Sequence, residues 1–304
     1  MAATKPVIRT VGLTKRYANN ITAVDRLDLE VEHGEVFGFL GLNGAGKTTT
    51  LRMLLGLIKP TSGSAIVAEH APGDPVGLHH IGSMIEGPAF YPYLSARENL
   101  KVVADYGGVA FGRIDGALDQ VGLLSRAHDQ FASYSMGMKQ RLGVAAALMK
   151  DPELMILDEP TNGLDPEGVV EMRALIRRLG TGDRTVILSS HLLNEVEQTC
   201  DRVAIINQGK LVRLGTVHEL RGEPALLVRA TPSDAAQRTL ERMFGTSIAP
   251  VDGTFRVSVD PERAADINAA LVSAGIRVSE LRPAERTLED VFLTATKHQA
   301  AAAA

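Results

Sequence analysis

A glycine-rich segment that ends in a lysine and a threonine is the strongest chemical signal in the sequence. Residues 41–48 read Gly-Leu-Asn-Gly-Ala-Gly-Lys-Thr and satisfy the pattern G-x-x-x-x-G-K-[ST]. In this pattern, glycines let backbone N–H groups converge on phosphate oxygens, the lysine reaches the outer phosphates, and the threonine hydroxyl ligates Mg²⁺. An apolar run over 36–40 and a sequence typical of a helix over 47–57 predict the strand, turn and helix that the pattern requires. Seven residues are expected to bind a nucleotide: Asn43, Gly44, Ala45, Gly46, Lys47, Thr48 and Thr49.

Two acids at the end of a second apolar run are candidates for metal binding and catalysis. Residues 154–157 are apolar, and Asp158 and Glu159 follow them. At the tip of a strand, Asp158 can hold Mg²⁺ beside the phosphate loop, and Glu159 can polarise an attacking water as a general base. Such a pair alone is more often a solvated strand end, but the phosphate loop reverses that preference. His191 follows a third strand-like run, 185–189, and we expect its imidazole to orient the terminal phosphate rather than to act as a free base.

The elements that must position these residues read as one α/β unit over residues 1–218. Apolar strand-like runs alternate with turns and helices, which predicts a parallel or mixed sheet. Residues 61–64 consist of turn-forming types and are expected to form a turn after the first helix. The block over 87–150 is helical in character, so we expect a helical subdomain inserted in this unit.

A different pattern begins after residue 218 and predicts a small α+β domain over 223–298. The sequence predicts a strand, a helix, a hairpin, a helix, a strand and a last helix. The hairpin is placed at Asp252 and Gly253, because Asp-Gly between two short apolar runs is a strong hairpin signal. The tail over 299–304 is expected to be disordered.

The composition excludes several classes of protein. With 304 residues, of which 45% are hydrophobic and 22% charged, the chain is expected to be globular rather than disordered. The formal net charge of -4 argues against non-specific binding of nucleic acid by an overall basic field. The single cysteine cannot form an intramolecular disulfide, so a cytosolic location is the default. We expect no signal peptide and no membrane-spanning helix, so any role at a membrane would use a partner chain.

The order of the motifs resembles the nucleotide-binding domain of ABC-type ATPases. Residues 134–141 read Tyr-Ser-Met-Gly-Met-Lys-Gln-Arg, which is similar to the signature sequence of this family, and residues 163–166 read Gly-Leu-Asp-Pro. Together with the phosphate loop, the Asp158-Glu159 pair and His191, these motifs extend the resemblance over about residues 5–218. The resemblance implies a P-loop NTPase of the ABC type that hydrolyses ATP, with ATP and Mg²⁺ as cofactors.

The resemblance also implies an assembly of two copies. The N-terminal N–H groups of the helix near Ser135, with the Ser135 hydroxyl and Gly137, form an anion site that in the family faces the γ-phosphate bound by a second subunit. A head-to-tail homodimer with two sandwiched ATP molecules is therefore expected. Asp165 falls where the family's D-loop crosses the interface. Tyr17 resembles the aromatic residue that stacks on adenine, although a tyrosine in such a loop is otherwise usually a packing residue.

Three departures from the family pattern bear on the branch and the chemistry. Glu86 stands where most of the family has glutamine; it can still approach Mg²⁺ and water, as a catalytic and metal-binding group, but adds negative charge at the γ-phosphate. Its surroundings, 85–92, are similar to the bacitracin and lantibiotic self-resistance branch of exporters, and 286–293 resemble the ending of drug-exporter ATPases. Met136 and Met138 replace the more common glycine and glutamine of the signature, which leaves Ser135 and Gly137 as the expected contacts.

The interpretation that follows is the ATP-hydrolysing subunit of an ABC exporter, which energises efflux of a drug or antimicrobial peptide. It implies a separate transmembrane permease subunit, a second nucleotide-binding subunit, no nucleic acid, and a cytoplasmic position on the inner face of the cell membrane. The alternative is a non-transport ABC ATPase that acts on nucleic acid or ribosomes. That alternative is disfavoured because the sequence has neither long coiled-coil heptads nor a second cassette.

Overall fold

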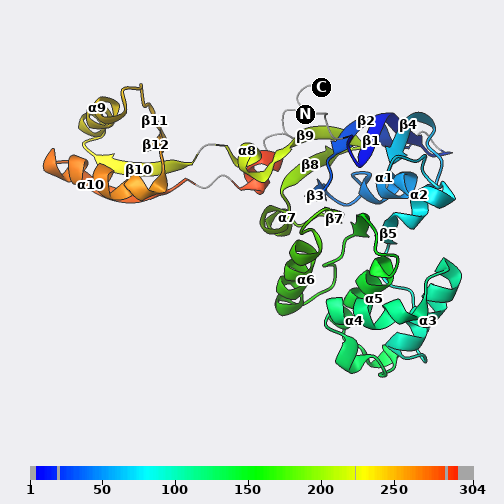
Figure 1. The fold of residues 1–304 in the computed structure, drawn as a ribbon. Helices are drawn as coiled ribbons and strands as arrows, with labels where there is room; N and C mark the ends of the chain where they lie inside the picture. Colours follow the sequence, from blue (N-terminus) through cyan, green and yellow to red (C-terminus); the bar gives the residue numbers. More distant parts are fainter. Residues whose placement is uncertain (1–4, 19–20, 223, 285–286, 294–304) are drawn as a thin grey trace. The chain divides into compact units, whose positions relative to one another are not determined.

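The computed structural model describes residues 5–18, 21–222, 224–284 and 287–293 (Figure 1). The described residues up to Val217 form one compact unit, and those from His218 onward form a second. Each unit has a buried apolar core of its own. None of the helices in these described ranges combines the length and the apolar character that a bilayer crossing needs. The predicted tail over 299–304 lies outside the described residues.

A six-stranded sheet forms the centre of the first unit, and its strand order is β5-β6-β7-β3-β8-β9. Neighbouring strands from β5 to β8 are parallel, and β9 is antiparallel to β8. The strands are β3 (Val36–Leu40), β5 (Ile81–Met84), β6 (Leu154–Asp158), β7 (Thr185–Ser190), β8 (Arg202–Asn207) and β9 (Lys210–Thr216). Strands β3, β6 and β7 are buried along their whole length, as their continuous apolar text predicts. Because parallel strands end at the same edge, the segments after β3, β5, β6 and β7 meet there.

A three-stranded antiparallel sheet, of order β2-β1-β4, completes the strands of this unit. It contains β1 (Ile8–Arg16), β2 (Thr22–Val31) and β4 (Ser62–Val67). The turn predicted over 61–64 is wrong from Ser62 onward, where β4 begins. The small residues are needed because the backbones approach closely: a Cβ on Gly63, whose φ is +82°, would stand 2.2 Å from the carbonyl oxygen of Gly12.

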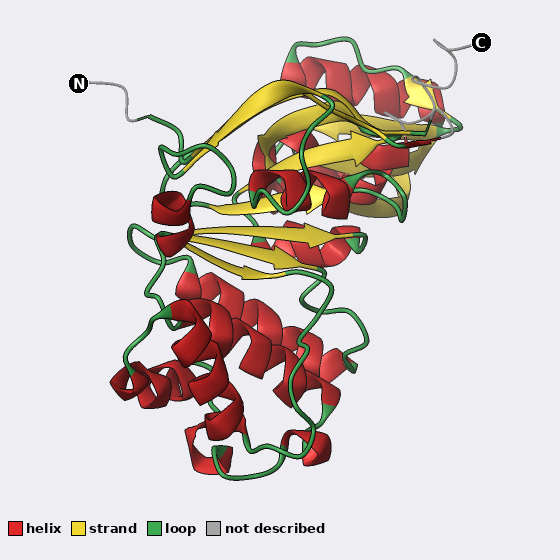
Figure 2. Ribbon diagram, turned by 90° about the vertical axis from the view of Figure 1, so that its right-hand side faces the viewer, coloured by secondary structure: helices red, strands yellow, loops and turns green. Residues whose placement is uncertain are grey.

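The predicted helical block lies next to β5 and forms the lower part of the view in Figure 2. Its helices are α3 (Ala96–Gly107), α4 (Ile114–Gln120) and α5 (Met136–Leu148). The Ser95 and Glu98 side chains form a capping box at the start of α3, as their spacing predicts. The remaining helices of the first unit are α1 (Lys47–Leu54), α2 (Pro75–His79), α6 (Pro166–Leu179) and α7 (Leu193–Thr199).

The second unit combines an antiparallel four-stranded sheet with helices, which confirms the predicted α+β class. Its strand order is β11-β12-β10-β13. The elements are α8 (Val217–Arg221), β10 (Ala225–Thr231), α9 (Ser233–Phe244), β11 (Pro250–Val251), β12 (Thr254–Ser258), α10 (Ala264–Ser273) and β13 (Arg277–Pro283). The hairpin prediction is confirmed: Asp252 and Gly253 both have positive φ, as a tight hairpin turn requires. The helix predicted from residue 261 starts with a 3-10 turn, and residues 288–293 are helical.

Candidate nucleotide-binding site

The phosphate loop joins β3 to α1, as the sequence predicts. Gly44 and Gly46 have φ values of 80° and 104°, a region that side chains rarely adopt. A Cβ on Gly46 would also stand 2.2 Å from the carbonyl oxygen of Ala23, so glycine is required there. Helix α1 begins at Lys47, and its first N–H groups have no partner within the helix, which makes this end an anion site. Of the other predicted contacts, Asn43 is exposed and Thr49 lies half-buried in the first turn.

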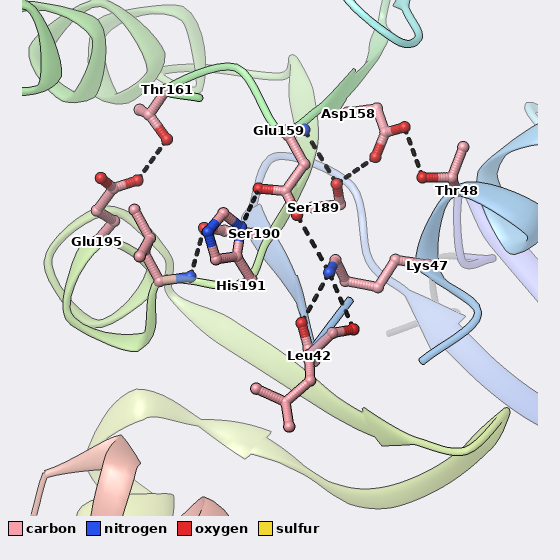
Figure 3. Close-up of polar contacts among 12 residues, drawn as sticks. Leu42, Lys47, Thr48, Asp158, Glu159, Thr161, Ser189, Ser190, His191 and Glu195 are labelled. Atoms are coloured by element: carbon pink, nitrogen blue, oxygen red, sulfur yellow. Dashed lines mark hydrogen bonds and ion pairs between the residues drawn. The ribbon is translucent and has the colours of Figure 1, made fainter. Parts of the chain in front are cut away.

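The Lys47 side chain lies folded over the loop and is almost fully buried. Its Nζ donates to the carbonyl oxygen of Gly41 at 2.7 Å and lies 3.1 Å from Oε1 of Glu159. The ammonium group is thus held at the mouth of the loop by the carbonyl oxygens of Gly41 and Leu42 and by the Glu159 carboxylate (Figure 3). A phosphate group at this place can replace the carboxylate as its ionic partner.

A hydroxyl and a carboxylate meet at the sheet edge, between α1 and β6. The hydroxyl of Thr48 donates to Oδ2 of Asp158 at 2.8 Å, and the hydroxyl of Ser189 donates to Oδ1 of the same carboxylate. Asp158 and Ser189 are register partners on β6 and β7, so the sheet itself brings them together. Ser189 was not among the predicted site residues; its position at the tip of a strand, two residues before His191, was the available signal.

The Thr48 and Asp158 pair fits a magnesium ion by the chemistry of its donors. Mg²⁺ prefers hard oxygen ligands, and in nucleotide sites it is held by one or two protein oxygens together with phosphate oxygens and water. Within the described residues, no cluster of three or more histidine, cysteine or acidic side chains is placed to hold a metal without such help.

Glu159 stands at the centre of the polar contacts drawn in Figure 3. Its Oε2 lies 2.8 Å from Nδ1 of His191, while Oε1 faces Lys47. Its φ is 48°, and its N–H bonds both the carbonyl oxygen and the hydroxyl of Ser189, at 3.2 and 3.0 Å. These backbone bonds fix where the carboxylate projects. The structure therefore brings three predicted residues, Lys47, Glu159 and His191, into one contact chain.

Glu86 lies at the same cleft but in a different set of contacts. It lines a cleft of about 510 Å³ together with Thr48, Asp158 and Glu159. Its carboxylate forms an ion pair with Arg52 on α1, and 64% of its side chain is exposed. The structure does not bring its oxygens into contact with Thr48 or Asp158, so the predicted roles of Glu86 in catalysis and metal binding stay predictions.

The signature residues line a second pocket, of about 490 Å³, whose lining includes no residue of the phosphate loop. Ser135 caps α5, and its hydroxyl accepts from the Met138 N–H at 3.3 Å. Asp165 caps α6 by accepting from the Gly168 N–H at 3.0 Å. The structure thus brings Ser135, Gly137 and Asp165 to one pocket, and Met136 of the same segment also lines the cleft that contains Thr48.

The residue that precedes the signature serine, Tyr134, anchors the segment. Its hydroxyl donates to the carbonyl oxygen of Arg126 at 2.7 Å, and burial raises the pKa of this phenol.

Tyr17, the predicted adenine contact, directly follows β1 and is 42% exposed. The ammonium of Lys15 lies 5.3 Å from the centre of its ring. The ring is therefore accessible for stacking, and its role at adenine stays a prediction.

Comparisons with known proteins agree with these motifs. The profile of the family described as "ABC transporter" matches residues 24–162. The bacitracin transport ATP-binding protein BcrA of Bacillus licheniformis is 43% identical over 94% of this chain and 96% of its own. The lantibiotic transport ATP-binding protein SrtF of Streptococcus pyogenes is 40% identical over 68% of this chain and 89% of its own. Among solved structures, cbiO1 of Clostridium perfringens, part of the ABC transporter complex cbiONQ, has a TM-score of 0.64 at 27% identity and covers 71% of this chain and 91% of that one.

The family prediction is therefore confirmed by sequence and by fold. The match to BcrA spans nearly the whole of both chains and so includes the second unit as well as the nucleotide-binding motifs. The chain belongs to the ABC transporter family, as an ATP-binding protein that hydrolyses ATP.

Proposed function

We propose that this protein energises the export of an antimicrobial peptide through a separately encoded membrane permease. The observation that carries this proposal is the contact chain Lys47–Glu159–His191 beside the Thr48–Asp158 pair, which supplies the groups that ATP hydrolysis needs. The peptide class rests on the relatives named for bacitracin and lantibiotic transport. The protein acts on the cytoplasmic side of the membrane, where ATP is available.

In this proposal the phosphate loop binds the triphosphate and Lys47 changes its partner. The ammonium leaves the Glu159 carboxylate and pairs with the outer phosphates, because they carry more charge and lie at the helix N-terminus. Thr48 and Asp158 would hold Mg²⁺, which would neutralise part of the charge of the triphosphate.

The release of Lys47 frees Glu159 to act as the general base. Its carboxylate takes a proton from a water molecule as the water oxygen attacks the γ-phosphorus, and the bond between phosphorus and the bridging oxygen of ADP breaks. His191, bonded to Glu159 through Nδ1, presents its other ring nitrogen to the terminal phosphate and orients it.

The second half of each site comes from another copy of the chain. Ser135 and Gly137 stand at the start of α5, where unpaired N–H groups and the helix dipole attract an anion. A head-to-tail dimer would place the pocket that they line on the partner's nucleotide. Separation of the two copies after hydrolysis then drives the permease.

The test combines ATPase activity with identification of the membrane partner. Purified protein is expected to release phosphate from ATP only with Mg²⁺, and Lys47→Ala to abolish the activity. Affinity purification from detergent-solubilised membranes is expected to recover a multi-spanning membrane protein. Recovery of ribosomes or nucleic acid in its place would refute the transport role.

A further inference from the structure

The acid at position 86 introduces a charge that the nucleotide site must tolerate. Glu86 follows β5, has a positive φ of 62°, and lines the cleft that also contains Asp158 and Glu159. Three carboxylates therefore border the cleft beside the expected place of the γ-phosphate. Carboxylates close to the γ-phosphate are expected to weaken ATP binding several-fold unless a cation offsets their charge.

The lysines that lie near the cleft have partners other than Glu86. Lys47 pairs with Glu159, and Asp158 accepts from two hydroxyl groups. Lys139 also lines the cleft, but its ammonium lies over the ring of Phe131, 5.4 Å from the ring centre. Within the described part of the chain, the cationic side chain in contact with Glu86 is Arg52.

The position of Arg52 on α1 connects this ion pair to the metal-binding end of the site. Thr48 and Arg52 are four residues apart on one helix, so their side chains leave the same face of α1 about one turn apart. Two-thirds of the Arg52 side chain is shielded from solvent, which strengthens its attraction for a carboxylate. Arg52 thus holds Glu86 beside Thr48 but not on it.

We propose that Arg52 is a positioning residue: it neutralises Glu86 and holds its carboxylate against α1, so that an acid at this position does not repel the phosphates of ATP. This inference rests on the proposed function, because it assumes that the cleft receives the γ-phosphate. Helix α1 would then both bind the phosphates at its N-terminus and position Glu86. The proposal also predicts that the effects of substituting Arg52 and Glu86 are coupled.

A double-mutant cycle tests whether Arg52 and Glu86 are energetically coupled. The affinity of a fluorescent ATP analogue is measured for the wild type, Arg52→Gln, Glu86→Gln and the double variant, each with Mg²⁺ and with excess EDTA. Arg52→Gln is expected to weaken binding about tenfold in EDTA, and less with Mg²⁺, because the metal ion offsets the uncompensated carboxylate. In the Glu86→Gln background the same change is expected to have less than about a twofold effect.

Two controls separate charge from folding. Arg52→Lys keeps the charge and is expected to restore most of the affinity, while thermal unfolding shows whether each variant is folded. Arg9→Gln removes an ion pair with Glu30 in the three-stranded sheet, in which the arginine is more exposed than Arg52, and is expected to leave binding unchanged.

The outcomes distinguish this inference from the proposed function. Equal weakening by Arg52→Gln in both backgrounds would show that Arg52 acts on the fold and not through Glu86. No weakening in either background would show that the nucleotide does not sense the charge of Glu86. Both results overturn the inference alone. Failure of the wild type to bind ATP, or equal binding by Lys47→Ala, would overturn the proposed function instead.

Discussion

The carboxylate of Glu159 bridges an imidazole and an ammonium group: Oε2 lies 2.8 Å from Nδ1 of His191, and Oε1 lies 3.1 Å from Nζ of Lys47. In the proposed mechanism, the general base and the phosphate-binding cation are therefore partners before the substrate binds. Binding of the triphosphate would separate them, so that Glu159 becomes free only when the substrate is in place.

Replacement of Glu159 by glutamine tests the role of its charge. Glu159→Gln keeps the shape of the side chain but cannot take a proton from water, so we expect phosphate release to fall at least about a hundredfold. ATP binding is expected to persist or strengthen, because Lys47 loses its competing carboxylate. Size-exclusion chromatography with ATP is expected to show a stable dimer. Turnover at the wild-type rate would show that another group is the base.

Replacement of His191 tests the orienting role. His191→Ala removes the partner of Glu159 Oε2 and, in the proposed mechanism, the donor to the terminal phosphate, so we expect kcat to fall about tenfold to a hundredfold with a smaller change in KM. His79→Ala, at the exposed end of α2, is the matched control and is expected to be silent. A fall in ATP affinity with unchanged kcat would contradict the orienting role.

The parts of the site that could be predicted are those written locally in the sequence. The spacing of glycines before Lys47 determines a loop, and an apolar strand before Asp158 determines where the carboxylates stand, so these positions follow from short segments. Ser189 and Arg52 could not be predicted in the same way. Their partners lie far away in the sequence, and only the register of β6 with β7, or the packing of α1 beside the segment after β5, brings them together.

The fold shows the same division. The buried strands β3, β6 and β7 have continuous apolar text and were predicted to within one residue. Strand β4 was missed because Ser62, Gly63 and Ser64 are exposed, so no alternation of apolar residues marks them. Helix α5 begins at Met136 with Ser135 as its cap, which agrees with the helix start expected near Ser135.

Mixing two inactive variants tests the composite site. Gly137→Asp places a carboxylate at the start of α5, where it suits the helix dipole but repels a phosphate. A Cβ at this position meets only Leu164, at 3.9 Å, so the variant is expected to fold. Gly137→Asp and Lys47→Ala are each expected to be inactive, and a re-equilibrated mixture to regain ATPase activity through heterodimers with one intact site. No recovery on mixing would argue against sites shared between copies.

Gly143 tests how tightly α5 packs against the segment that carries Glu86. A Cβ on Gly143 would lie 2.4 Å from Sδ of Met84 and 3.1 Å from Cβ of Pro88. We expect Gly143→Ala to lower the free energy of unfolding by about 1–3 kcal/mol through overpacking. Gly116→Ala on α4, where a Cβ has open space, is the control and is expected to stabilise by about 0.5–1 kcal/mol. Denaturant unfolding measures both; equal effects would contradict the close packing at Gly143.

Cys200 provides a measure of unfolding that depends on pH in a defined direction. Burial raises the pKa of its thiol well above the usual value, so the folded protein keeps the proton where an unfolded chain loses it. Stability from this group is therefore present below about pH 8.5 and declines as the pH rises above that value.

We expect no reaction with a disulfide reagent at pH 8 in the folded protein, and one reactive thiol per chain after denaturation. From pH 8 to 10, the free energy of unfolding is expected to fall about 1–2 kcal/mol more in the wild type than in Cys200→Ala; rapid labelling of folded protein, or parallel pH profiles, would contradict the burial of this thiol.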